Sequence, residues 1–254
     1  MSRLRKSKAI IIKTMPWHES SKIITLYARE WGLVDVIARG VMRRNNPFGG
    51  KLEILNLAEI VISDKSSRSL QILTDIALLN SFMKMRGEMD RLPYALAMSE
   101  LIDQIFEERQ GDPTFFDFCV QILSQMETAS NPELVFWYFL LKLSSYLGFK
   151  PNLDQCKNCG KESTISSAYF SPENGAIFCE DCASGAGMTI RLSKEAFNFL
   201  RNLQNFPHRK ISEMKIPHKL QFDFNALLLN YLNLHLDRHL HIRSLQLLMN
   251  ETDP

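Results

Sequence analysis

The sequence has no long hydrophobic run and no recognisable export signal. No stretch of its 254 residues approaches the roughly 18–20 consecutive apolar residues that a membrane-spanning helix needs. The basic segment Met1–Lys8 is not followed by the apolar core and small-residue cleavage site of a signal peptide. We therefore expect a cytosolic protein that does not contact a membrane.

The sequence also lacks the motifs that carry common enzyme chemistry. It has no Gly-x-x-x-x-Gly-Lys-Ser/Thr, no Gly-x-Gly-x-x-Gly and no Gly-x-Ser-x-Gly. The acidic pairs Glu107-Glu108 and Glu180-Asp181 have no histidine partner nearby in the sequence, and no carboxylate cluster suits the magnesium of a nuclease. His235, His239 and His241 lack the further ligand that a metal site would need, so we interpret them as surface histidines. We predict that the protein is not an enzyme and has no small-molecule substrate.

Net charge is small, but its distribution along the chain is uneven. The formal net charge is only +2. From Met1 to Phe82 there are 13 Lys and Arg against 7 Asp and Glu, whereas the remainder has 17 against 21. The basic character therefore belongs to the N-terminal third, where it would attract a polyanion.

The most basic stretch, Arg39–Lys51, carries four cations and lies in an interval that has no acid between Asp35 and Glu53. Its glycines and proline disfavour regular structure, and guanidinium groups match phosphate oxygens. An isolated basic loop is more often a solvated surface, but strand-like runs flank this one, so we interpret it as a nucleic-acid-binding loop on a β scaffold. The candidate contacts are Arg39, Arg43, Arg44, Lys51, Lys13 and Lys22, with Lys6 and Lys8 beside them and the aromatics Trp17, Tyr27, Trp31 and Phe48 interleaved. Most of these aromatics are better explained as core, so the charges carry the prediction.

Short β-prone runs separated by turn-rich pieces fill the first 80 residues. They are Ala9–Thr14, Lys22–Tyr27, Leu33–Ala38, Leu52–Leu55, Glu59–Ser63 and Ser69–Thr74. Five or six strands of this length fit a small closed barrel, because closure removes exposed strand edges. An OB-fold barrel is the first candidate and an SH3-like barrel the second, since the sequence does not give the order of the strands.

After Asn80 the apolar residues recur at the spacing of amphipathic helices. The expected helices are Leu92–Arg109, Thr114–Glu127, Glu133–Leu147, Lys194–Leu203 and Pro217–Leu236, with a short amphipathic piece at Ile242–Met249 and a frayed end at Glu251–Pro254. Asp112, Asn131 and Ser193 are predicted N-caps, and Gly148 is a predicted C-terminal cap. The helix that begins at Glu133 is apolar nearly all round, so we expect it at the centre of a helical core.

Four of the five cysteines form two Cys-x-x-Cys pairs. Cys156 and Cys159 make the first pair, Cys179 and Cys182 the second, and 19 residues separate them, a spacing typical of a zinc ribbon. The segments Ser167–Phe170 and Ala176–Phe178 between the pairs are expected to form a hairpin. Four thiolates complete a tetrahedron, so we predict one structural Zn²⁺ per chain; the alternative is a set of reduced cysteines without metal. The remaining cysteine, Cys119, stands alone in an apolar helix.

Two groups of short motifs follow one another along nearly the whole chain. The N-terminal group comprises Ile10–Thr14, Glu19–Tyr27, Gly32–Val34, Ala38–Arg44 and Gly49–Leu52. The second, Leu147–Gly160, reads Leu-Gly-x-x-Pro-x-Leu-x-x-Cys-x-x-Cys-Gly and is the more specific. In content and order these motifs resemble the bacterial recombination mediator family RecO.

The resemblance implies an N-terminal OB fold joined to an α-helical domain that carries a zinc finger. Proteins of that family bind single- and double-stranded DNA, anneal complementary strands, and act with RecR and single-stranded-DNA-binding protein to load RecA at gaps; they are cytoplasmic and nucleoid-associated. Carried over to this sequence, the loop cations Arg39, Arg43, Arg44 and Lys51 would form the main DNA surface, and Cys156, Cys159, Cys179 and Cys182 would hold the zinc. The C-terminal tail of the single-stranded-DNA-binding protein would dock in a groove of the helical domain near a cation, although no motif fixes the place.

These observations predict an α+β protein of two domains. Residues 1–80 would be a basic, nucleic-acid-binding OB-fold barrel, and residues 81–254 an α-helical domain with a zinc finger at about residues 153–186. The predicted function is DNA repair and recombination mediation. The alternative is a non-catalytic protein-interaction scaffold with a zinc ribbon and no direct DNA contact.

Overall fold

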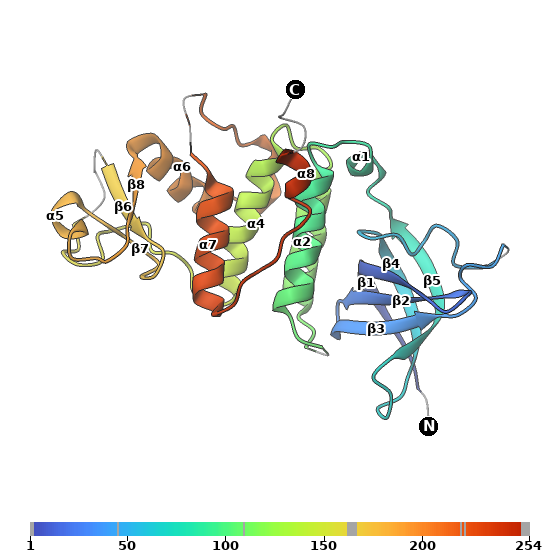
Figure 1. The fold of residues 1–254 in the computed structure, drawn as a ribbon. Coiled ribbons are helices and arrows are strands. Elements are labelled where there is room, and N and C mark those ends of the chain that lie inside the picture. Colours follow the sequence, from blue (N-terminus) through green and yellow to red (C-terminus); the bar gives the residue numbers. More distant parts are fainter. Residues whose placement is uncertain are drawn as a thin grey trace. The chain divides into compact units, whose positions relative to one another are not determined.

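A computed structural model describes residues 3–44, 46–108, 110–161, 167–218, 220 and 222–249 (Figure 1). The chain forms two compact units: one contains the chain up to Glu127 together with the segment that begins at His241, and the other extends from Thr128 to Leu240. Within the described ranges, no helix combines the length and apolar character that crossing a membrane requires. The predictions for Arg109 and for Glu251–Pro254 concern residues outside these ranges.

Five strands of the first unit form a closed barrel in the order β1-β2-β3-β5-β4. They are β1 (Arg3–Trp17), β2 (Ser21–Ala28), β3 (Gly32–Ala38), β4 (Leu57–Asp64) and β5 (Gln71–Asn80). All neighbours pair antiparallel except β3 and β5, which are parallel and close the barrel. This arrangement of five strands is the OB fold and decides against the SH3-like alternative.

The barrel core is formed by side chains that point inward from every second position of the strands. In β4, Ala58, Ile60 and Ile62 are buried, whereas the residues between them are half-buried, as expected when successive side chains point to opposite faces of a strand. These residues pack with Ile24 and Leu26 of β2 in one hydrophobic cluster.

The strand predicted at Leu52–Leu55 was wrong, because this segment forms turns. Leu52 and Leu55 are nevertheless buried, and Leu55 adopts a φ of +72°, which no regular strand contains. The Leu55 N–H donates to the Ile11 carbonyl over 2.8 Å. The apolar pattern of this segment therefore reflects a turn whose two leucine side chains are buried in the protein interior.

Helices complete the first unit. They are α1 (Met83–Arg86), α2 (Leu92–Ile105), α3 (Pro113–Met126) and the short α8 (Gln246–Met249). The predicted N-cap of α3 is confirmed, because the Asp112 carboxylate accepts hydrogen bonds from the Thr114 and Phe115 N–H groups. α2 contacts β1.

The second unit is built around α4 (Pro132–Tyr146), as its all-round apolar sequence predicts. Its aromatic run Phe136–Phe139 is buried, and the helix packs against α6, α7 and the 3-10 helix η1. These elements are α6 (Lys194–Asn205), η1 (His208–Glu213) and α7 (Phe224–Leu236). Gly148 follows α4 with a φ of +92°, which agrees with its predicted capping role.

One predicted cap and one predicted helix start differ in the structure. Asn131 precedes α4 but makes no side-chain capping hydrogen bond. Helix α7 begins at Phe224 and not at Pro217, because the Asp223 carboxylate accepts from the Ala226 N–H and caps the helix there. The predicted Ser193 cap of α6 is confirmed by its hydrogen bond from the Ala196 N–H.

A small three-stranded sheet also belongs to the second unit, in the order β7-β6-β8. The predicted hairpin is present as β6 (Ser167–Ser171) and β7 (Ala176–Phe178), and β8 (Ile190–Ser193) adds a third strand on the other side of β6. The four-residue helix α5 (Glu180–Ala183) follows β7 directly.

Candidate nucleic-acid interface and metal centre

Two loops of the barrel are joined at the end of β1. The hairpin loop between β1 and β2 contains His18, Glu19 and Ser20, and the basic loop begins after β3. The Met42 N–H of the basic loop donates to the Ser20 carbonyl over 3.1 Å, and the turn at its start depends on Gly40, whose φ is +68°. His18 also has a positive φ, +52°, which is uncommon for a residue with a side chain. The Met42–Ser20 hydrogen bond therefore joins the two loops side by side.

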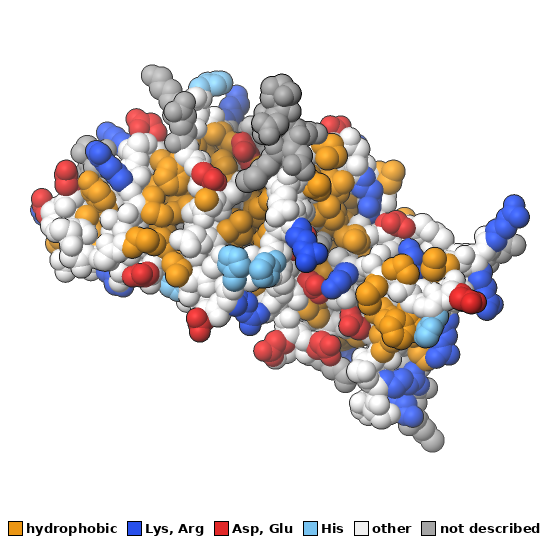
Figure 2. Space-filling model, viewed as in Figure 1, with side chains coloured by type: hydrophobic (Ala, Val, Ile, Leu, Met, Phe, Trp, Pro, Cys, Tyr) orange, Lys and Arg blue, Asp and Glu red, His pale blue; other side chains and the backbone are white. Residues whose placement is uncertain are grey.

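A hollow of about 520 Å³ lies between these loops, and we call it the Trp17 pocket. Its walls include Trp17, His18, Ile37, Arg39 and Arg43, and its remaining lining residues are Ser20, Ser21 and Gly40. Two arginines therefore line a hollow whose lining, among the described residues, contains no carboxylate. In Figure 2, a histidine side chain lies beside an apolar patch on the barrel, and Lys and Arg side chains follow the neighbouring edge.

The predicted nucleic-acid contacts fall into two groups in the structure. Arg39, Arg43 and Arg44 are exposed, and within the described part of the chain none of their side chains forms an ion pair. Lys22 is half-buried and lies opposite Ala38 in the register of β2 and β3. Two of the arginines meet in the Trp17 pocket, so the structure brings this part of the candidate set together.

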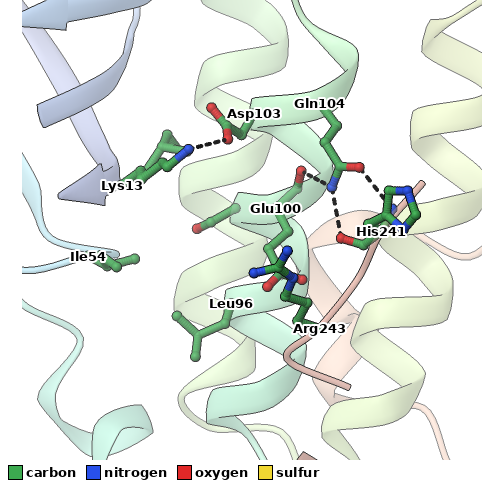
Figure 3. A pocket seen from close by; sticks show the side chains of 10 residues that line it. Lys13, Ile54, Leu96, Glu100, Asp103, Gln104, His241 and Arg243 are labelled. Atoms are coloured by element: carbon green, nitrogen blue, oxygen red, sulfur yellow. Dashed lines mark hydrogen bonds and ion pairs between the residues drawn. The ribbon is translucent and has the colours of Figure 1, made fainter. Parts of the chain in front are cut away.

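Lys13 and Lys51 are held by other parts of the chain. The Lys13 Nζ lies 3.6 Å from the Asp103 carboxylate of α2, in a separate cavity of about 480 Å³ (Figure 3). The Lys51 Nζ donates to the carbonyl oxygens of Pro47 and Ile76 over 3.0 and 3.3 Å. Both cations are therefore less available to phosphate than the arginines.

The cavity in Figure 3 also shows how the C-terminal segment is attached to α2. The Gln104 side chain donates to the His241 carbonyl over 3.0 Å and accepts from the His241 N–H over 2.8 Å. The Glu100 carboxylate accepts from both the N–H and the hydroxyl of Ser244. Two side chains one turn apart on α2 thus hold the returning chain.

The four paired cysteines gather in the second unit, as predicted. Their sulfur atoms all lie within 4.8 Å of one another. Cys156 and Cys159 lie in a tight turn in which the Gly160 N–H donates to the Cys156 carbonyl, and Gly160 has a φ of +68°. Cys179 precedes α5, and Cys182 lies within it. The fifth cysteine, Cys119, is buried in α3.

The sulfur positions fit a tetrahedral metal ion. Metal–sulfur bonds of about 2.3 Å place the corners of a tetrahedron about 3.8 Å apart. The sulfurs of Cys159 and Cys179 are 3.7 Å apart, close to this value. All four ligand positions would be filled by protein, which leaves no site for water or substrate.

The acidities of the thiols also favour a cation at their centre. Burial raises the pKa of Cys156, but N–H groups of Cys159, Cys179 and Asn158 outweigh it and lower the pKa to about 6. A hydrogen bond from Asn158 lowers the pKa of Cys182, yet the neighbouring thiols and burial raise it to about 12. Thiols this close cannot all ionise without a compensating positive charge, and a divalent ion supplies one.

The interpretation of all three C-terminal histidines as surface residues was wrong for His235. This side chain is half-buried, its ring stacks on Phe149 with centroids 5.1 Å apart, and its Nε2 lies 3.0 Å from the Pro172 carbonyl. Helix α7 ends at Leu236, so His239 does not share a helical face with it. No sequence pattern indicates this role, because it depends on packing between distant segments.

Comparison with known proteins covers almost the entire chain. Residues 1–82 match the family model described as "Recombination protein O N terminal", and residues 86–244 match "Recombination protein O C terminal". The chain belongs to the RecO family. This is the family that the sequence motifs resemble, and its description is that of a recombination protein and not of an enzyme, as predicted.

Several relatives in the RecO family match over most of both chains. DNA repair protein RecO of Desulforamulus reducens is 25% identical over 94% of this chain and 92% of its own length. The corresponding proteins of Caldanaerobacter subterraneus and Bacillus pumilus are each 27% identical, over 92% and 90% of this chain and 94% and 88% of their own lengths. Membership of the RecO family supports a role in DNA repair.

Proposed function

We propose that this protein is a recombination mediator in DNA repair. It binds single- and double-stranded DNA, promotes annealing of complementary strands and, with RecR, helps to load RecA on gaps coated with single-stranded-DNA-binding protein. Family membership supports this proposal for the chain as a whole. We further propose that it acts in the bacterial cytoplasm, associated with the nucleoid.

The observation that carries the DNA-binding proposal is the group of exposed arginines on the OB barrel. Arg39, Arg43 and Arg44 are exposed, and no ion pair neutralises them within the described ranges. A free guanidinium can displace condensed counterions from a phosphate, and their release favours binding. Lys22 extends this surface, whereas Lys13 and Lys51 would first have to leave Asp103 and the carbonyl groups that hold them.

Annealing follows from the same electrostatics. Two DNA strands repel each other through their phosphates, and a protein surface that neutralises part of this charge lowers the repulsion. Base pairing then proceeds without any chemical step, which agrees with a protein that lacks a catalytic site in its sequence. Phosphate contacts require only that positive charges lie at suitable positions, so the binding does not depend on DNA sequence.

We propose that Cys156, Cys159, Cys179 and Cys182 hold one structural Zn²⁺. When bound, the ion would stabilise the fold of the small sheet and its turns, a region with little apolar surface of its own. The thiolate donor set and the sulfur spacing support zinc over a hard, oxygen-preferring cation.

The alternative is an interaction scaffold, in which the barrel docks a partner protein and its charge is incidental. RecR and the C-terminal tail of the single-stranded-DNA-binding protein remain proposed partners in either case. A scaffold would not bind purified DNA with a strong dependence on salt, whereas a mediator would. The two functions therefore differ in one measurable property.

The test removes two arginines and measures the dependence of DNA affinity on salt. We expect the double variant Arg43→Gln/Arg44→Gln to bind single-stranded DNA of any sequence more weakly. Its slope of log affinity against log salt should be shallower by about 1.4, because each phosphate contact on a single strand contributes about 0.7.

A matched control removes the same charge from the other unit. Lys194→Gln/Lys215→Gln changes two exposed cations of the second unit and should leave the slope unchanged. If the arginine variant kept the wild-type slope, the loop would not be the DNA surface. If the wild-type protein did not bind purified DNA, the scaffold would be the better account.

A further inference from the structure

Trp17 is exposed where the other aromatic residues of the barrel are buried. Its side chain is 41% exposed, whereas Tyr27, Trp31 and Phe48 are at most 8% exposed and belong to the protein interior. Interior packing therefore accounts for three of the four aromatics interleaved with the basic residues: Trp31 and Phe48 belong to the barrel core, and Tyr27 packs against phenylalanines of the α2–α3 region. It does not account for Trp17, which ends β1 at the rim of the Trp17 pocket.

The pocket combines an aromatic surface with positive charge. The rings of Trp17 and His18 meet edge to face with centroids 4.9 Å apart and form one wall. Arg39 and Arg43 also line the pocket, with Ile37 among the remaining lining residues. The Arg43 backbone is held by its N–H, which donates to the Gly40 carbonyl over 3.1 Å. The volume, about 520 Å³, is within the range of about 300–1,000 Å³ that small-ligand sites occupy.

The chemistry of this lining selects a planar ring that carries negative charge beside it. An indole stacks on flat π systems, and guanidinium groups bind phosphate oxygens. Purine and pyrimidine bases within a nucleic-acid strand have both properties, and every base offers a face for stacking. A carboxylate in the lining would repel such a ligand, and the described lining residues include none.

We propose that the Trp17 pocket binds one unpaired base of single-stranded DNA, stacked on the Trp17 indole, with the adjacent phosphates on Arg39 and Arg43. This inference rests on the proposed DNA-binding function and adds the basis for strand preference. In a duplex, each base is already stacked between its neighbours and cannot enter the pocket. Trp17 therefore strengthens binding to single strands only, whereas the arginines act on both forms of DNA.

The first experiment compares two substitutions at Trp17 with labelled oligothymidylate and a labelled duplex of equal length. Trp17→Leu keeps an apolar side chain but cannot stack, and we expect a loss of single-strand affinity of about 5- to 150-fold. Duplex affinity should change less than about twofold. Trp17→Phe retains an aromatic face and should restore part of the single-strand affinity.

A control variant removes another exposed apolar residue from the same strand. Leu4 lies near the opposite end of β1, is 69% exposed and pairs with Ser63 of β4. Leu4→Ala should leave both affinities unchanged. Thermal unfolding of every variant shows whether the barrel remains folded.

Tryptophan fluorescence provides a second readout that needs no substitution for its main result. The chain contains three tryptophans, and Trp31 and Trp137 are each only 6% exposed. Saturating oligothymidylate should quench the emission of the wild-type protein through Trp17, while the duplex should quench it little. The quenching should be absent in Trp17→Leu.

The outcomes separate this inference from the proposed function. Selective loss of single-strand binding in Trp17→Leu, together with selective quenching, supports the base site. Equal losses for both DNA forms, or no loss and no quenching, overturn it and leave the arginine surface intact. If the wild-type protein bound neither DNA form, the proposed function would fail, and the base site with it.

Discussion

Among single residues, Asp117 illustrates how one ion pair links folding to pH. The Arg29 guanidinium donates two parallel hydrogen bonds to the Asp117 carboxylate, from Nε over 2.9 Å and from Nη2 over 2.7 Å. These hydrogen bonds lower the pKa of Asp117 below its ordinary value and outweigh burial, which acts in the opposite direction. A carboxyl group whose pKa is lower in the folded state contributes stability above its unfolded pKa and loses it as the pH falls.

We therefore predict that stability decreases as the pH falls below about 4, the ordinary pKa of aspartate. Part of this decrease comes from Asp117, so Asp117→Asn should be less stable than the wild type near pH 6 and should lose less stability between pH 6 and pH 3. The effect should be small, because the pair is half-exposed and screened by solvent. Thermal unfolding midpoints across this pH range provide the measurement. Parallel curves for the two proteins would show that the pair does not couple folding to protonation.

At the same scale, the sequence predicted which cysteines come together, but it did not predict what surrounds the candidate lysines. The four cysteines could be predicted because metal ligands require fixed residue types at short spacing. Lys13 and Lys51 show the opposite case. Their charge is visible in the sequence, but the Asp103 carboxylate and the Ile76 carbonyl that hold them come from distant segments.

Among the structural elements, two glycines allow the barrel to meet the loop between α2 and α3. A Cβ on Gly32 would lie 2.4 Å from the Gln110 carbonyl oxygen, and a Cβ on Gly111 would lie 2.3 Å from the Glu30 carbonyl carbon. Leu33 and Glu108 form an isolated parallel bridge beside them. Backbone therefore contacts backbone here, with no flexible side chain that could move aside.

Gly111→Ala should destabilise the protein by about 1–3 kcal/mol, the usual cost of forcing extra atoms into a closely packed contact. Urea unfolding of the variant and the wild type measures the difference. Gly87→Ala is a suitable control, because Gly87 has a φ of −86° and an added Cβ would meet no atom of the described residues within 4 Å. Equal stability of Gly111→Ala and the wild type would mean that the backbone at Gly111 can move away from Glu30 at little cost.

The prediction of elements succeeded where a local signal was sufficient. Asp112 and Ser193 cap their helices through hydrogen bonds within the same turn, which spacing alone reveals. The start of α7 was misplaced because Pro217 is an equally good local signal, and the Asp223 cap prevailed. Strand β8 was missed because it exists only through its pairing with β6.

At the scale of the whole molecule, the four-cysteine cluster and the proposed DNA surface belong to different units. We therefore predict that Cys159→Ser loses the bound zinc and loosens the small sheet, because the ion provides much of the folding free energy of such a region. The affinity of the barrel for DNA should stay within about twofold of the wild-type value, since no phosphate contact is removed. Metal analysis, proteolysis and DNA titration of the same preparation measure the three effects.

Cys119→Ala is the matched control. It removes a buried thiol of α3 that does not belong to the four-cysteine cluster. It should retain one equivalent of zinc. A full equivalent of zinc in Cys159→Ser would contradict the four-cysteine site, and a large loss of DNA affinity would show that the metal centre also contributes to DNA binding.

The order of the five barrel strands and the division into two units lay beyond the sequence pattern. Alternating apolar residues show that strands exist, but the parallel pairing of β3 with β5 depends on contacts between residues far apart in the chain. We predicted a boundary between two domains at residue 80. The two compact units do not test whether these domains fold independently, so this boundary stays a prediction. The family models divide the chain nearby, after residue 82.

The return of the C-terminal segment to α2 has a consequence for biosynthesis. Gln104 accepts a hydrogen bond from His241, and Glu100 accepts one from Ser244. The ribosome adds both of these donors more than a hundred residues after their partners. A nascent polypeptide therefore completes its first unit only after the second has been translated.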